Sequence, residues 1–113
     1  MPNMRFSEEW DKLKNNISRG EEITTFRAYK PQKDVYYNKL LENKERIHIV
    51  LQNKLIATAT LVDKQYKWST DLTLEQIKND TYQHYTKKDW EILMKKFYGI
   101  EKVFGLWLTF RID

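Results

Sequence analysis

The chain has 113 residues, of which 41% are hydrophobic and 32% are charged, and its net charge is +4. This length suits one hydrophobic core, so we expect residues 1–113 to form a single domain. The absence of cysteine excludes disulfides, thiolate metal sites and cysteine nucleophiles. No apolar run reaches the roughly 20 residues of a membrane-spanning helix, and no apolar leader precedes the first charged residues. We therefore expect a cytoplasmic protein that lacks a membrane segment.

Apolar residues at helical spacing predict a first helix over residues 8–19. Trp10 and Leu13 begin a stripe that is expected to face the core. Ser7 stands at the position of an N-terminal cap. Gly20 follows a basic residue, as is common where a helix ends.

Alternation of residue types predicts a strand over residues 22–27. Ile23 and Thr25 fall on one face of this strand and Phe26 on the other. The next stretch, residues 32–43, mixes apolar and polar types in a pattern that fits either a short helix or a loop.

A second region of alternation predicts a β-hairpin. Its strands cover residues 46–51 and 55–62, joined by a short polar connection. Residues 66–68 either extend the second strand or begin a loop.

Two capped helices and a last strand complete the chain. Thr73 caps a helix over residues 74–79, and Thr86 caps a longer one over 87–98. Residues 103–112 alternate as a terminal strand. The order of these elements predicts one α+β domain built on a small sheet or barrel. The rings expected in its core are Trp10, Trp90, Phe97, Phe104 and Phe110.

Three segments together resemble one known family. Residues 17–27 read Ile-Ser-Arg-Gly-Glu-Glu-Ile-Thr-Thr-Phe-Arg, in which a helix ends at glycine and a strand with Thr-x-Arg follows. Residues 55–62 and 89–112 look like a strand after a central hairpin, and a late helix with a closing strand. This pattern resembles the ASCH domain, a PUA-like group linked to RNA, over roughly residues 5–112. The resemblance implies a small PUA-like β-barrel with an N-terminal helix and a late two-helix insertion before the closing strand.

The same resemblance implies a chemistry against which the residues can be compared. Some small bacterial ASCH proteins hydrolyse acylated cytidines with a Lys, a Thr and a Glu. Here the Thr falls on Thr25, whereas the lysine position falls on Glu22 and the glutamate position on Gln83. Glu22 supplies no cation to a developing oxyanion, and Gln83 cannot exchange a proton. We therefore expect binding without catalysis; if the chain is an enzyme, Thr25 and Glu22 are the expected catalytic pair.

A hydroxyl and a guanidinium two positions apart are the main candidates for ligand contacts. Arg27 offers a planar fork to a phosphate or a base edge, or else pairs with a nearby carboxylate and braces the sheet. Thr25 beside it either binds a base or sugar or is an ordinary strand residue. Lys30 follows in the most basic part of the chain, where it either contacts a phosphate or is simply solvated.

Aromatic residues in polar surroundings are candidates for base stacking. Trp68 and Tyr82 lie outside the clean apolar stripes, and Gln83 and His84 adjoin Tyr82 in an expected loop. His84 is far in sequence from the other histidine, His48, and the chain has no zinc-binding motif, so we expect neither a metal nor a cofactor.

These residues predict a cleft between the strand of Thr25 and Arg27 and the segment 68–85. We expect it to bind RNA or a modified nucleotide without catalysis. One alternative is an amidohydrolase that acts on N4-acylated cytidine-type nucleosides with an altered catalytic set. A second alternative is a protein-interaction scaffold, in which exposed aromatic residues are contact anchors.

Overall fold

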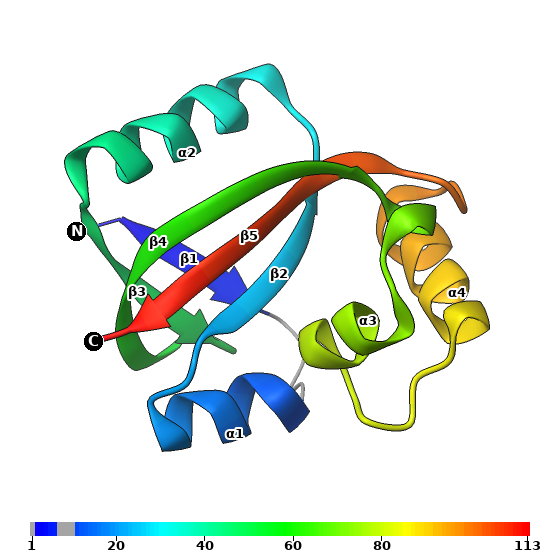
Figure 1. Ribbon diagram of the computed structural model, residues 1–113, viewed down its shortest axis with the longest axis horizontal. Helices are drawn as coiled ribbons and strands as arrows, with labels where there is room; N and C mark the ends of the chain where they lie inside the picture. The colour runs from blue at the N-terminus through cyan, green and yellow to red at the C-terminus, as the bar shows by residue number, and fades with distance from the viewer. Residues whose placement is uncertain (1, 7–10) are drawn as a thin grey trace.

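A five-stranded sheet organises the part of the chain that the computed structural model describes, residues 2–6 and 11–113 (Figure 1). Its order is β1-β3-β4-β5-β2, with β1 parallel to β3 and every other neighbouring pair antiparallel. The strands are β1 (Asn3–Phe6), β2 (Ile23–Ala28), β3 (Arg46–Leu51), β4 (Lys54–Trp68) and β5 (Phe104–Ile112). Four helices accompany the sheet in these residues, so the predicted α+β class is confirmed.

The sheet is open, which corrects the expectation of a closed barrel. Its two edge strands, β1 and β2, form no ladder with each other within the described residues. A side chain spans the gap between them instead, because Arg27 Nη2 donates to the backbone carbonyl of Arg5 at 2.8 Å. With only four residues, β1 offers little backbone for a second ladder.

The helices divide between two regions of the sheet. They are α1 (Asp11–Arg19), α2 (Pro31–Asn43), α3 (Leu74–Asp80) and α4 (Lys87–Tyr98), with a 3-10 turn (Ser69–Asp71) after β4. α2 packs on β4, whereas α1 and α3 pack on β2, and Figure 1 shows α2 apart from the other three. Of the helices in residues 2–6 and 11–113, none is long and apolar enough to cross a membrane.

Most predicted elements are present, with small shifts of their bounds. The long late helix has the predicted span, and its cap is reciprocal: the Thr86 amide donates to the Asp89 carboxylate at 2.8 Å, and the Asp89 amide donates to the Thr86 hydroxyl at 3.2 Å. The predicted first helix is described from Asp11 onward. The cap at Ser7 and the stripe residue Trp10 lie outside the described residues.

Two segments that the sequence left open are now assigned. Residues 32–43 belong to α2, whose first turn contains Pro31, a residue that suits this position because it has no amide to leave unpaired. Residues 66–68 extend β4, which makes it the longest strand of the sheet. Figure 1 shows β4 and β5 running side by side along most of that length.

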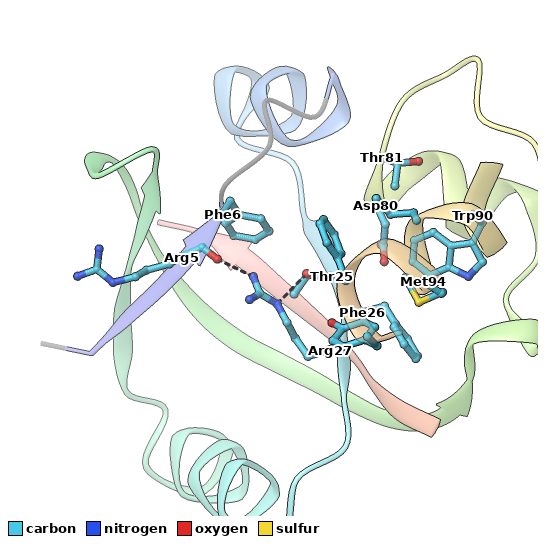
Figure 2. Close-up of a pocket in the computed structure, with 12 residues that line it drawn as sticks. Arg5, Phe6, Thr25, Phe26, Arg27, Asp80, Thr81, Trp90 and Met94 are labelled. Atoms are coloured by element: carbon cyan, nitrogen blue, oxygen red, sulfur yellow. Dashed lines mark hydrogen bonds between the residues drawn. The ribbon is translucent and has the colours of Figure 1, made fainter. Parts of the chain in front are cut away.

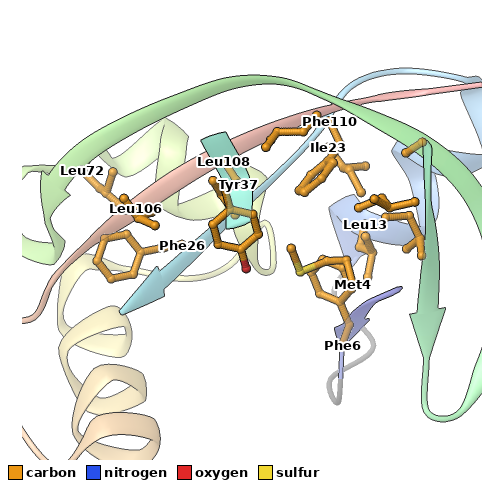
Figure 3. Packing of buried hydrophobic residues seen from close by; sticks show 14 of the residues in the cluster. Met4, Phe6, Leu13, Ile23, Phe26, Tyr37, Leu72, Leu106, Leu108 and Phe110 are labelled. Carbon is orange, nitrogen blue, oxygen red and sulfur yellow. The ribbon is translucent and has the colours of Figure 1, made fainter. Parts of the chain in front are cut away.

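The hydrophobic core lies on the predicted inner face of β5 and beneath the helices (Figure 3). Leu106, Leu108 and Phe110 are fully buried there, as expected from the alternation. The expectation that Phe97 and Phe104 are core residues is wrong, because their exposed fractions are 41% and 37%. Phe97 lies in the last turn of α4, and Phe104 is the first residue of β5, so both project at the ends of their elements.

β1 is the element that sequence patterning did not predict. It has four residues, too few for a clear alternation, although Met4 and Phe6 are buried and the two residues at odd positions are exposed. Its partner β3 lies far along the chain, so only the folded structure reveals the pairing. β1 also forms one wall of the cavity described below.

Close packing at Gly105 generates a first prediction. A Cβ at this position would lie 2.4 Å from the backbone oxygen of Arg27 and 2.5 Å from a ring carbon of Phe26. Gly105→Ala is therefore expected to lower the free energy of unfolding by about 3 kcal/mol or more, as measured by urea denaturation.

A matched control for this prediction is Gly99→Ala. Gly99 has open space around it, so an alanine there costs only about 1–2 kcal/mol, which is the cost of placing a Cβ at its positive φ of 79°. Equal losses in the two variants would contradict the proposed close packing of β2 against β5.

Candidate functional site

A cavity of about 270 Å³ lies along the free edge of β2 (Figure 2). β1 lines it on one side and α4 on the other, with the end of α3 between them. The side chains of Thr25 and Arg27 line it from one face of β2, and Phe26 from the other face. β2 is an edge strand of the sheet, and no other strand among the described residues pairs with its outer edge. The cavity therefore contacts residues from both faces of β2.

Arg27 is held in place by three contacts within this cavity. Its Nε donates to the Thr25 hydroxyl at 3.2 Å, and its Nη2 donates to the Arg5 carbonyl at 2.8 Å. Its guanidinium carbon also lies 5.0 Å from the centroid of the Phe6 ring, within the range of a cation–π contact. Figure 2 shows the guanidinium between β1 and β2, with the dashed hydrogen bonds on both sides. The orientation of Arg27 is thus fixed before any ligand binds.

Asp80, the last residue of α3, places a buried carboxyl group on the cavity wall. The residue is 6% exposed. One oxygen, Oδ1, accepts hydrogen bonds from the Thr24 hydroxyl and, at 3.2 Å, from the Trp107 indole. The other oxygen, Oδ2, is buried and has no hydrogen-bond partner of normal geometry among the described residues. The amide of Phe26 is close enough to stabilise the charge of this carboxylate, so the carboxyl group is held mainly by the protein itself.

Burial sets the protonation state of Asp80. Desolvation raises the pKa of its carboxyl to about 7, although the Thr24 and Trp107 hydrogen bonds, the Phe26 backbone and the charge of Arg27 all lower it. Near neutral pH the group is therefore present in both forms. The protonated form can donate to a ligand, and the ionised form can accept from one.

Local sequence explains why α3 ends at this position. Thr73 and Gln76 form a reciprocal cap at its start, and Ile77 anchors it in the core. At the other end Thr81 leaves the helical conformation, with φ −133° and ψ −123°, and its hydroxyl donates to the Ile77 carbonyl at 2.6 Å. Asp80 then faces the edge of β2.

The structure separates the predicted site residues into several places. Thr25 and Arg27 line the same cavity, as the predicted cleft requires. Glu22 is exposed, lies just before β2 and does not line this cavity, so it is not gathered with Thr25. Lys30 lines a neighbouring cavity that also contains Arg27.

The remaining predicted residues lie outside both cavities. Tyr82 and His84 stack on each other in the loop between α3 and α4, with ring centroids 5.3 Å apart, and Gln83 is exposed in the same loop. Trp68 is 43% exposed at the end of β4, where Lys102 lies 4.8 Å from its ring centroid. The structure thus does not bring these rings to the pocket along β2.

Sequence reasoning missed Asp80 and both contributors from β1, Arg5 and Phe6. Asp80 sits at the end of a capped helix, a position that usually faces solvent, so its type and spacing carry no signal of burial. Within residues 2–6 and 11–113, no group of three or more His, Asp or Glu side chains is arranged to hold a metal ion.

Comparison with known proteins adds no family assignment. No family model, no curated protein and no solved structure matches the chain.

The raised pKa of Asp80 predicts an unusual pH dependence of stability. An acid whose pKa is higher in the folded state than its ordinary value of 3.8 holds its proton more tightly when folded, so its contribution is complete below about pH 4. That contribution is lost as the pH rises towards 7, by up to about 4 kcal/mol. Asp80→Asn should therefore become more stable relative to the unmodified protein between pH 4 and 8, as measured by denaturant unfolding at several pH values.

The control is Asp63→Asn, which changes an exposed carboxylate on β4. Its stability difference from the unmodified protein should stay nearly constant over the same pH range. A constant difference for Asp80→Asn as well would show that Asp80 titrates normally.

Proposed function

We propose that this chain binds RNA or a modified nucleotide, with one base entering the cavity along the edge of β2. The observation that carries the proposal is the convergence of Thr25, Arg27 and Asp80 on one open cavity. Together they offer a hydroxyl, a cationic fork and a carboxyl group that can accept or donate. Base edges present this mixture of donors and acceptors.

The unused hydrogen-bonding capacity of these groups supports the proposal. Arg27 donates its hydrogen bonds to Thr25 and Arg5 from Nε and Nη2, which leaves Nη1 for a ligand. The Thr25 hydroxyl accepts from Arg27 and keeps its own proton to donate. Asp80 adds a carboxyl group to the wall of the same cavity. A ligand that contacts Arg27 and Thr25 would use hydrogen-bonding capacity that the protein leaves open at these two side chains.

The size and walls of the cavity favour a flat, small ligand. Its volume of about 270 Å³ is just below the roughly 300–1,000 Å³ typical of sites for drug-sized molecules. Phe6, Phe26 and Trp90 contribute aromatic surface to the walls. These features fit one nucleobase with its sugar better than a longer segment of nucleic acid.

We also propose that the fold is a PUA-like variant related to the ASCH family. Support comes from the order of elements from α1 to β5 and from the helix–glycine–strand segment that leads to Thr25 and Arg27. In this proposal the barrel is left open between β1 and β2, and the Arg27 side chain bridges the opening.

The binding proposal predicts a loss of affinity on Arg27→Ala. Removal of the fork should weaken binding of a single-stranded ribohexanucleotide by about 5- to 150-fold, because a specific side-chain-to-base contact of this type contributes about 1–3 kcal/mol. Fluorescence anisotropy of a labelled hexanucleotide at low salt measures the effect. Thr25→Val keeps the shape of the side chain and should also weaken binding.

Arg111→Ala is the matched control. Arg111 is exposed on β5 and lines neither cavity along β2, so its loss makes the same charge change elsewhere. If Arg27→Ala and Thr25→Val, both shown to be folded by circular dichroism, bind RNA as tightly as the unmodified chain, the base-binding proposal is wrong.

A second candidate function is hydrolysis of N4-acylated cytidine-type nucleosides. The observation in its favour is that Asp80 lines the cavity beside Thr25 and has a pKa of about 7, which suits a group that exchanges protons during catalysis. In this candidate Asp80 would fill the acid–base role for which Glu22 is misplaced.

Incubation with a panel of N4-acylated cytidines separates this candidate from binding alone. Turnover that Asp80→Asn abolishes, while Asp63→Asn leaves it intact, would establish the hydrolase. Absence of product at all pH values between 5 and 9 would rule it out.

A further inference from the structure

A second cavity, of about 410 Å³, lies between β1, β2 and the start of α2. Arg27, Lys30 and Lys33 line it, together with the tyrosines Tyr36 and Tyr37. No carboxylate of the described residues lines it. We propose that this cavity binds a phosphate group of the same ligand whose base occupies the first cavity, and this inference rests on the proposed function.

The charges around the second cavity favour an anion. Among its neighbours, Asp34 in the first turn of α2 is engaged elsewhere, because it accepts hydrogen bonds from Lys64 and Tyr66. Its hydrogen bonds are therefore not made to Lys30 or Lys33. The charge of Glu45 acts on Tyr36, but Glu45 does not line the cavity. The cationic fork and ammonium groups match a phosphate, which accepts several hydrogen bonds.

Two tyrosines, Tyr36 and Tyr37, form part of the cavity wall, so the lysines here do not simply extend into solvent from an open surface. The Lys33 ammonium lies over the Tyr36 ring, 5.6 Å from its centroid, so the lysine is held at the cavity by a cation–π contact. Tyr37 is buried, which raises the pKa of its hydroxyl, and the nearby charge of Arg27 acts in the opposite direction. The hydroxyl of Tyr37 thus lies within electrostatic range of the guanidinium.

The two cavities adjoin through shared residues. Arg27, Arg5 and Tyr98 line both of them. Figure 2 shows the guanidinium of Arg5 pointing away from that of Arg27, so Arg27 is the cation at the junction. A ligand that reaches across Arg27 from the first cavity would meet Lys30 and Lys33 next. This geometry fits a base joined through its sugar to a phosphate.

A comparison of nucleosides with nucleotides tests the inference. Isothermal titration calorimetry would measure the binding of the four common ribonucleosides, their 3′- and 5′-monophosphates and a mixed ribohexanucleotide. At least one monophosphate is expected to bind about tenfold more tightly than its nucleoside. The double variant Lys30→Ala/Lys33→Ala should remove most of this gain and leave nucleoside binding unchanged.

A matched control variant is Lys87→Ala/Lys88→Ala. These lysines lie in the first turn of α4, are exposed and line neither cavity. The Lys30/Lys33 variant should also flatten the plot of log affinity against log salt for the hexanucleotide by about 1.4, because each single-strand phosphate contact contributes about 0.7 to that slope. The control should keep the slope of the unmodified chain.

The outcomes distinguish the two proposals. A monophosphate that binds as tightly as the hexanucleotide identifies a terminal phosphate as the ligand group, whereas a tighter hexanucleotide identifies the strand backbone; either supports the inference. If nucleosides and monophosphates bind equally, or the double variant matches the control, the phosphate site is wrong and the base pocket stands. If none of these probes binds, both proposals fail.

Discussion

The guanidinium of Arg27 joins the two edges of an open sheet. It reaches from β2 to a backbone carbonyl of β1, and on the way it fixes the Thr25 hydroxyl and lies against the Phe6 ring. These contacts show that Arg27 braces the sheet, and its predicted role as a ligand-binding arginine stays a prediction. Arg27 does brace the fold, but its partner is a carbonyl rather than a carboxylate, so its positive charge is not neutralised by that contact. The same side chain can hold the strands and attract an anion.

Two neighbouring cavities with different chemistry follow from this bridge. The first contains the Asp80 carboxyl and aromatic walls, whereas the second contains lysines and tyrosines without a carboxylate among the described residues. Arg27 lies at their junction and contributes to both. The first cavity thus contains a carboxyl group and the second contains ammonium groups, so their electrostatic character differs. This difference suits a ligand with a neutral, hydrogen-bonding end and an anionic end.

Local patterns account for what could be predicted from the sequence. Thr86 and Gly99 bound α4 because cap chemistry involves residues close in the chain. In β5, apolar residues alternate with other residue types, and this pattern predicts which face of the strand is buried. β1 and Asp80 escaped prediction for the opposite reason, since their roles depend on partners far away in sequence: β1 pairs with β3, and Asp80 is buried by β2 and β5. The sequence predicted that Thr25 and Arg27 lie together, because one strand carries both. It did not predict the residues of β1, α3 and α4 that form the rest of the cavity.

The position of β1 at the edge has a kinetic consequence. Four residues pair with a strand that lies on the far side of α1, β2 and α2 in the chain, so this ladder closes a long loop and is weakly held compared with the central strands. Transient detachment of β1 would open both cavities at one wall while the remaining ladder persists. If the binding proposal holds, a ligand that contacts Arg27 is expected to slow amide hydrogen exchange in β1 before it changes exchange in β4 and β5.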